Sequence, residues 1–280
     1  MKTTHILLFL MAAMIALSSD AASALEDVTG RTRWELPQMD LELSLPGDLP
    51  VVTRTEVAHG PILEEMGLDP DTLLSEPSEV FVQLWALDLE MDCIIVVNMA
   101  EHEASRRFWN YNDLSDSKLR AYGGALNKNA AEIFQSDEFA EKAASIGNAE
   151  IAEQFKNNGI IVSFDDIYKT ESATYMRLST EETVDGETMF GRQYATAYNG
   201  RAITVKLLAL EGPVTPVQDE ILKLILESVT FTQTLPQPQE YKKSAGLSTT
   251  GQWINGLVPV ILVLIIVWSR RKRQKDNFPN

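Results

Sequence analysis

The sequence predicts an α/β domain outside the cytoplasm, followed by a single C-terminal transmembrane helix. An apolar run over residues 253–268 ends at a strongly basic tail, which is typical of a membrane-spanning helix with its cytoplasmic flank. A shorter apolar segment, residues 6–17, precedes a small-residue cleavage pattern. Between these segments, β-rich runs alternate with helical patterns, which predicts a domain built from both a sheet and helices.

The C-terminal apolar run is short for a membrane span. Its sixteen residues reach about 24 Å as a helix, whereas the hydrocarbon core is about 30 Å thick. Flanking residues and extension of the Arg270 side chain to the interface close most of this gap. Trp253 and Trp268 stand at the two ends, where interfacial aromatic residues prefer to lie. We therefore predict a transmembrane helix at 251–269 and a cytoplasmic basic tail at 270–280, rather than a buried part of a globular core.

Residues 1–24 predict a cleaved signal peptide. Lys2 gives a positive start, and Ala22-Ser23-Ala24 matches the pattern that signal peptidase cleaves. A retained N-terminal anchor is the competing interpretation, but the apolar run is short for a span. Cleavage after Ala24 would leave the following domain outside the cytoplasm, so we expect a single-pass protein of the cell membrane.

The N-terminal half of the domain predicts strands and a few helices. Residues 25–38 are polar and irregular, which predicts a loose lead-in. Residues 39–46 alternate apolar and polar side chains at period two, as in a strand with one solvated face. The other predicted elements are strands at 51–57, 79–88 and 92–99, short helices at 61–67 and 69–74, and helical segments at 115–134 and 137–155.

The C-terminal half carries the clearest pattern. Asn199-Gly200 lies between two β-rich runs, and both residues tolerate the positive φ of a type I′ hairpin turn. Thr215 and Gln218 are placed as N-cap and capping-box partner of a helix whose apolar side should pack on the sheet. Residues 233–250 are rich in Pro, Gln, Ser and Lys, which predicts a linker with no apolar face to bury. The predicted strands are 159–166, 172–179, 188–198 and 201–210, and residues 229–232 close the domain.

Four segments of the chain resemble the PsbP-like family of bacterial extracytoplasmic proteins. Residues 191–210 and 219–231 are similar to the strand, Asn-Gly hairpin, strand and helix that recur near the end of that domain. Residues 81–88 and 92–99 resemble two strands in the earlier half of the same domain, which a helical middle follows. The resemblance covers most of residues 39–232.

The resemblance implies that residues 39–232 form one α/β domain, an α/β/α sandwich in which helices flank a central antiparallel sheet. It also implies a non-catalytic role in binding or assembly. No residue matches a cofactor site of the photosystem II subunit in that family, so no cofactor is expected.

The charge of the chain restricts its partners. The chain has 40 acidic and 24 basic residues. Without residues 1–24 and 270–280 it has 38 acidic and 18 basic residues, a net charge of −20. Such a charge argues against nucleic acid, because phosphates require patches of Lys and Arg. Solubility accounts for scattered acidic residues, and an acidic cation-binding domain remains an alternative although no calcium-loop motif is present.

Catalytic patterns are scarce. The segment His102-Glu103-Ala104-Ser105-Arg106 begins like the zinc-protease motif, but an arginine stands where the second ligand is required. Cys93 is the only cysteine and lies in an apolar run, which predicts a buried and inert thiol. Pairs such as Asp165-Asp166 leave a carboxylate-based extracytoplasmic hydrolase as an alternative, but most pairs in so acidic a chain are simply solvated. We therefore predict no catalytic residue and no metal ligand.

One segment before Ser115 combines large aromatic residues with arginines in an otherwise acidic chain. Interfaces favour Trp, Tyr and Arg at their centres. The alternative is that the aromatic residues plug the sheet edge under the helix while the arginines pair with nearby acids. We predict a non-catalytic, membrane-tethered binding or scaffold protein with a protein partner of unknown identity. The candidate interface residues are Arg106, Arg107, Phe108, Trp109 and Tyr111.

Overall fold

The computed structural model describes residues 30–47, 49–53, 80–88, 90–101, 103–134, 160–184 and 187–242. Within these ranges, no helix combines the length and the apolar character needed to cross a membrane. Several predictions lie outside the described residues: the signal peptide, the transmembrane helix at 251–269, the basic tail, and the helical segments at 61–67, 69–74 and 137–155.

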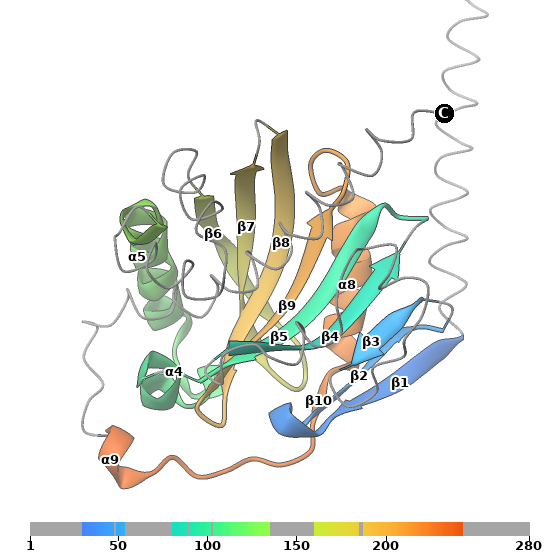
Figure 1. The fold of residues 1–280 in the computed structure, drawn as a ribbon. Helices are drawn as coiled ribbons and strands as arrows, with labels where there is room; N and C mark the ends of the chain where they lie inside the picture. The colour runs from blue at the N-terminus through green and yellow to red at the C-terminus, as the bar shows by residue number, and fades with distance from the viewer. Residues whose placement is uncertain are drawn as a thin grey trace, which may run out of the picture.

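Two antiparallel sheets form the described part of the domain (Figure 1). The small sheet has the order β1-β2-β10, and the large sheet has the order β3-β4-β5-β9-β8-β7-β6. All pairs within both sheets are antiparallel, which confirms the predicted antiparallel architecture. The strands are β1 (Arg31–Leu36), β2 (Leu41–Pro46), β3 (Val51–Thr53), β4 (Val80–Asp88), β5 (Cys93–Ala100), β6 (Ile160–Lys169), β7 (Thr174–Val184), β8 (Glu187–Tyr198), β9 (Arg201–Ala209) and β10 (Thr230–Phe231). The helices are α4 (Glu103–Phe108), α5 (Asp116–Phe134), α8 (Pro216–Ser228) and α9 (Gln239–Lys242), with 3-10 turns at Pro37–Met39 and Tyr111–Asp113.

Local signals fix the hairpin and the cap that the sequence predicts. Asn199 and Gly200 have φ values of 52° and 77°, so the β8–β9 turn uses two left-handed residues as expected for a type I′ turn. Thr215 Oγ1 accepts a hydrogen bond from the backbone N–H of Gln218 at 3.2 Å, and Gln218 Oε1 accepts one from Thr215 N at 2.8 Å. This capping box satisfies N–H groups that the first turn of α8 would otherwise leave open.

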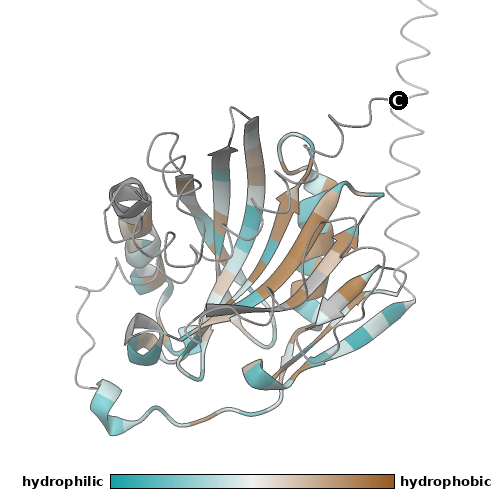
Figure 2. Cartoon of the chain, viewed as in Figure 1, coloured by the Kyte–Doolittle hydropathy of each residue, from teal (hydrophilic) through white to brown (hydrophobic). Residues whose placement is uncertain are grey.

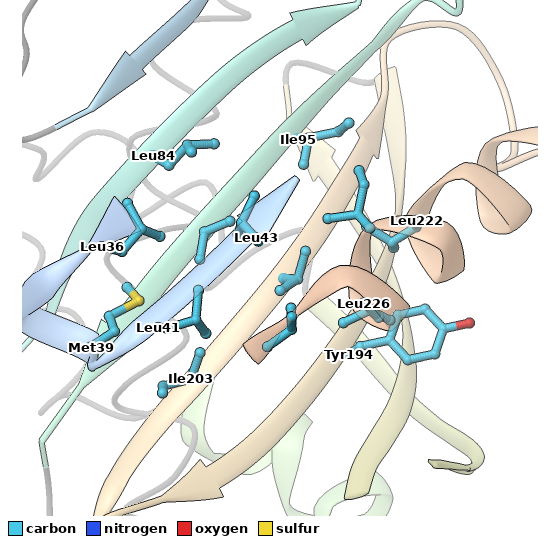
Figure 3. Packing of buried hydrophobic residues seen from close by; sticks show 14 of the residues in the cluster. Leu36, Met39, Leu41, Leu43, Leu84, Ile95, Tyr194, Ile203, Leu222 and Leu226 are labelled. Atoms are coloured by element: carbon cyan, nitrogen blue, oxygen red, sulfur yellow. The ribbon is translucent and has the colours of Figure 1, made fainter. Parts of the chain in front are cut away.

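The hydrophobic core lies between one face of the large sheet and a layer made of the small sheet and α8 (Figure 3). In β2, the side chains of Leu41, Leu43 and Leu45 alternate toward this core while the residues between them are partly exposed. Leu222 and Leu226 bring the apolar side of α8 to the same place. Figure 2 shows that the middle strands of the large sheet are the most hydrophobic part of the fold.

The opposite face of the large sheet carries α5. A Cβ atom at Gly123 would lie 2.3 Å from Cδ2 of Phe164, so α5 and β6 meet closely at this pair. Phe164 is paired across the strands with Leu178, and Leu178 with Gln193. Directly opposed residues share a face, whereas Tyr194, the neighbour of Gln193, points into the core cluster. Helices therefore pack on both faces of the large sheet.

Three predictions were wrong in detail. The lead-in contains β1, an edge strand in which only Trp34 and Leu36 are shielded from solvent, and a polar edge strand carries little apolar periodicity. The domain has two sheets and not one. Within the described residues, β1 and β10 both pair with β2, and these three strands form a sheet separate from the large one. The linker is not free along its whole length: residues 233–242, which we call the strap, lie against the domain (Figure 1).

Candidate functional site

The five predicted interface residues lie at the end of α4 and in the turn that follows it, and the structure separates them into two groups. Tyr111 is fully buried, with 0% of its surface exposed. Phe108 packs edge-on against the rings of Tyr111 and Tyr122, with centroids 6.1 and 5.0 Å away. These two residues therefore fill the space under α5, as the alternative interpretation described, and Tyr111 cannot form part of an exposed surface.

Arg106, Arg107 and Trp109 form the outer group. Arg106 is exposed, and its guanidinium lies 3.4 Å from a carboxylate oxygen of Glu101. Arg107 is partly buried at the end of the helix. Trp109 is partly buried as well, and its ring contacts Leu235 and Tyr241 of the strap. A protein partner at this group remains a prediction.

Trp109 has a backbone conformation that L residues rarely adopt, with φ of 59°. Its N–H donates to the carbonyl of Ser105 at 2.9 Å and so ends α4, a position where glycine is usual. The cost of a left-handed L residue is about 1–2 kcal/mol. Its own carbonyl accepts from Gly200 N at 3.0 Å, which ties α4 to the β8–β9 turn.

Gly200 gives the Trp109 ring its place. A Cβ atom at Gly200 would lie 2.6 Å from Cζ3 of that ring, so the indole lies directly on the glycine. Glycine is therefore required at this position for two reasons, its φ of 77° and the close approach of the ring. Asn110 completes the junction, since its Oδ1 accepts from Asn199 N at 2.7 Å.

The strap runs from β10 to α9 along one end of the domain, without helix or strand at residues 233–238 (Figure 1). The indole Nε1 donates to the carbonyl of Leu235 at 2.8 Å. Further along, the ring of Tyr241 stacks on the indole with centroids 6.4 Å apart and an interplanar angle of 19°. One residue before Leu235 in the strap, the hydroxyl group of Thr234 shares a hydrogen bond of 2.6 Å with that of Tyr198. Trp109 is thus in contact with both the middle and the end of the strap.

The side chain of Asn199 binds backbone groups of the strap. Its Nδ2 donates to the carbonyl of Gln233 at 3.0 Å, and its Oδ1 accepts from the N–H of Leu235 at 2.8 Å. A side-chain amide offers one donor and one acceptor in the same plane, as a peptide group does. Asn199 therefore takes the place of a neighbouring strand for the two backbone groups on either side of Thr234.

Gln237 joins the strap to the end of α4. Its Nε2 donates to the carbonyl of Arg107 at 2.9 Å and lies 3.4 Å from that of Arg106. The last carbonyls of a helix have no partner within the helix. The strap supplies that partner here, so α4 is capped by a residue about 130 positions later in the chain. We call Trp109, Asn110, Asn199, Gly200 and the last turn of α4 the strap site.

A line of alternating charges runs along the edge of the strap site. Arg201 bridges Asp40, at 2.8 Å, and Glu101, at 3.3 Å, and Glu101 in turn faces Arg106. Asp40 Oδ1 also accepts from Gln233 Nε2 at 2.7 Å. The start of the strap is therefore held by a carboxylate that an arginine already orients.

Two groups considered for catalysis, Cys93 and Asp166, lie within the described residues. The Cys93 thiol is buried, and burial raises its pKa far above the ordinary value, which leaves it protonated at neutral pH. The pKa of Asp166 is lowered by the N–H of Ile167 and by Arg120, so this carboxylate stays ionised. In the described ranges, no three His, Cys, Asp or Glu side chains gather as metal ligands. His102 lies outside the described residues.

A second polar cluster lies under α8 and has no sequence motif. Asp219 Oδ2 is 2.8 Å from the guanidinium of Arg177, and Asp219 Oδ1 accepts from the Tyr194 hydroxyl at 3.0 Å. Arg192 bridges Asp219 and Asp165, and Ser179 donates to Asp165 at 2.7 Å. Burial and the nearby carboxylate raise the pKa of Tyr194. Each carboxylate of this cluster has an arginine partner, so the cluster connects α8 to β7 and β8.

Comparisons with known proteins give no family. No family model matches the chain, and no curated protein matches it. Among solved structures, the chain is similar to the immunity protein TplEi of T6SS from Pseudomonas aeruginosa, complexed with "L" peptide. The identity is 10%, the TM-score is 0.27, and the match covers 79% of this chain and 84% of that chain. A TM-score this low carries no argument about fold or function.

Sequence analysis found the aromatic cluster and the Asn-Gly turn but did not connect them. The strap site depends on side chains, such as Asn199 and Gln237, that bind backbone groups, and such contacts leave no periodic pattern. The proline spacing of residues 236–238 was the one available signal, because alternate prolines keep a chain extended.

Proposed function

We propose that this chain is a non-catalytic binding or scaffold module, tethered to the cell membrane by residues 251–269, with its domain outside the cytoplasm. The observation that carries the proposal is the strap site, where α4 and the β8–β9 turn seat an extended peptide segment through side-chain and backbone hydrogen bonds. A surface that binds peptide backbone in this way has the chemistry of a protein-recognition site.

The position of the strap supports a short tether. With residues 233–242 bound to the domain, only residues 243–250 separate it from the predicted membrane span. Eight extended residues reach at most about 28 Å, so the domain would stand close to the bilayer surface. The exposed Arg106 would then be available to a partner beside the strap.

The resemblance to PsbP-like proteins belongs to the same proposal. Packing of α8 and α5 on opposite faces of the large sheet supports an α/β/α sandwich, with the small sheet added on the α8 face. The members of that family are known chiefly for binding and assembly, which agrees with a scaffold role.

Photo-crosslinking in intact cells tests the binding role. A photoreactive amino acid in place of Arg106 should crosslink to a partner, and the same group in place of Glu211 should not. Glu211 is also exposed, but it follows β9 at the far end of the strand from the Asn199 turn. The absence of any crosslink from position 106, or an equal product from both positions, would contradict a binding surface at α4.

Protease treatment of intact cells tests the location. External protease should digest the domain and spare an epitope placed after Asn280, because the basic tail is expected to stay in the cytoplasm. Protection of the domain would reverse the proposed orientation.

A further inference from the structure

The strap makes more specific contacts with the domain than a passive connection requires. Its backbone bonds to Trp109 and Asn199, and its Gln237 side chain bonds to the end of α4. None of the strap residues belongs to the buried core cluster, which ends at Phe231. Removal of the strap would therefore leave the core covered and the strap site open.

Contacts that do not involve the strap hold Trp109 and Asn199 of the strap site in position. Asn199 is held by the turn it forms and by Asn110, whose Oδ1 accepts from the Asn199 backbone N–H. Trp109 is fixed by its bond to Ser105 at one end and by Gly200 under its ring. The donors and acceptors that meet the strap are thus oriented by contacts that do not involve the strap, which lowers the ordering cost of binding.

The pattern of contacts defines the kind of ligand. The hydrogen bonds to the strap site use Gln233, Leu235 and Gln237, which are alternate residues, while Thr234 bonds to the Tyr198 hydroxyl beside the site. The two prolines lie between and after Leu235 and Gln237. Proline cannot donate a backbone hydrogen bond, and the residue before it prefers an extended conformation. Prolines at 236 and 238 therefore keep the segment extended without removing a group that the site uses.

We propose that the strap site is a peptide-binding site for extended, proline-containing segments of the Leu-Pro-Gln-Pro type, and that the strap is its ligand bound within the same chain. This inference deepens the proposed binding function and rests on it, since it names the class of segment that the surface recognises. Trp109 recognises a carbonyl and a downstream aromatic ring, and Asn199 recognises the extended backbone before the first proline.

The test uses the full chain in detergent and a fluorescent peptide with the sequence of residues 232–242. A release variant carries Leu235→Pro, Gln237→Ala and Tyr241→Ala, which remove the N–H that Asn199 accepts, the cap of α4 and the stacked ring. The release variant should bind the peptide, whereas the wild-type chain should bind it at least about tenfold more weakly. The reason is that its own strap acts at an effective concentration of order millimolar. Thermal unfolding of both proteins shows whether the release variant is folded.

Conservative changes in the site identify the recognition residues. Added to the release variant, Trp109→Phe removes the indole donor together with part of the ring that stacks on Tyr241, and Asn199→Asp replaces the amide donor by a charged acceptor that faces the Gln233 carbonyl. Each should weaken peptide binding at least about fivefold, the effect of one lost hydrogen bond. A control peptide in which proline replaces Leu235 lacks one N–H and should bind less tightly than the native sequence.

Three results would overturn the inference: no peptide binding by a folded release variant, equal binding by the wild-type chain, or no effect of either site change. If the release variant unfolds, Tyr241→Ala alone replaces it, and the same comparisons decide. A crosslinked partner at Arg106 together with a failed peptide assay would remove this inference and leave the proposed function in place. Peptide binding without a crosslinked partner would keep the strap site as a peptide-binding site and remove the partner surface at Arg106.

Discussion

The core layer and the strap both rest on the large sheet, but they are held by different forces. Under α8 and the small sheet, leucines and other apolar side chains are almost completely buried. At the strap, hydrogen bonds to backbone groups and one ring stack do the same task over a largely exposed segment. Figure 2 shows this contrast as brown middle strands beside a mostly teal and white strap.

This difference separates stability from recognition. Burial of apolar surface contributes about 25 cal/mol per Å², so the core layer accounts for most of the stability. A hydrogen bond that replaces one to water contributes only about 1 kcal/mol, so the strap can open while the domain stays folded. Paired substitutions in the two regions test this separation directly.

The largest effect is expected for Leu226→Ala in the core. Leu226 has no exposed surface, and removal of its side chain leaves a cavity that should lower the free energy of unfolding by about 2–5 kcal/mol. The matched control is Leu235→Ala in the strap, where the side chain is 38% exposed and the loss should stay near 0.5 kcal/mol. Chemical denaturation measures both values, and similar losses at the two positions would contradict the separation.

A smaller effect is expected for Asp219→Asn under α8. Asp219 is 6% exposed and faces Arg177 and Arg192, so loss of its charge leaves two partly buried guanidinium groups without their shared carboxylate. We expect the free energy of unfolding to fall by about 2 kcal/mol. The control Glu220→Gln changes an exposed carboxylate of the same helix and should cost about 0.5 kcal/mol or less. Equal losses in denaturation curves would show that the cluster under α8 adds nothing to stability.

Gly200→Ala acts on both regions, because Gly200 lies in the turn that joins β8 and β9 of the large sheet and supports Trp109. The new methyl group needs a positive φ and meets the indole ring, so stability should fall by about 1–2 kcal/mol and the strap should loosen. Gly124→Ala in α5 is the control: nothing lies within 4 Å of the added Cβ, and a helix gains up to about 1 kcal/mol from alanine. Opposite signs in thermal unfolding are expected, and a loss at both positions would contradict this account.

Sequence analysis predicted the features that depend on neighbouring residues. The Asn199-Gly200 turn and the capping box of α8 each involve residues within three positions of one another, and their chemistry is specific. The burial of Cys93 followed from the apolar run around it. The turn and the capping box are confirmed because local backbone geometry alone decides them.

Features that depend on distant residues could not be predicted. The small sheet needs β10 to pair with β2, and nothing in two residues identifies a partner so far away. The strap was predicted to be a linker because it has no apolar face, yet it is held by hydrogen bonds to residues 34 to 193 positions away. Tyr111 was placed in the candidate interface on composition, which cannot distinguish a buried ring from an exposed one.

The smallest effect is expected for Trp109→Phe in the otherwise unchanged chain. Phenylalanine keeps an aromatic ring but lacks the outer indole atoms that lie over Gly200, so this change removes the hydrogen bond to the Leu235 carbonyl and part of the ring contacts with Gly200 and Tyr241. The strap should open more often, and hydrogen exchange of the Leu235 amide should become about fivefold faster. Amides of Val97 and Val205 in the paired strands β5 and β9 report on the core and should exchange at unchanged rates. Equal acceleration in β9 would mean that strap and core open together, and no acceleration at Leu235 would mean that Trp109 does not hold the strap.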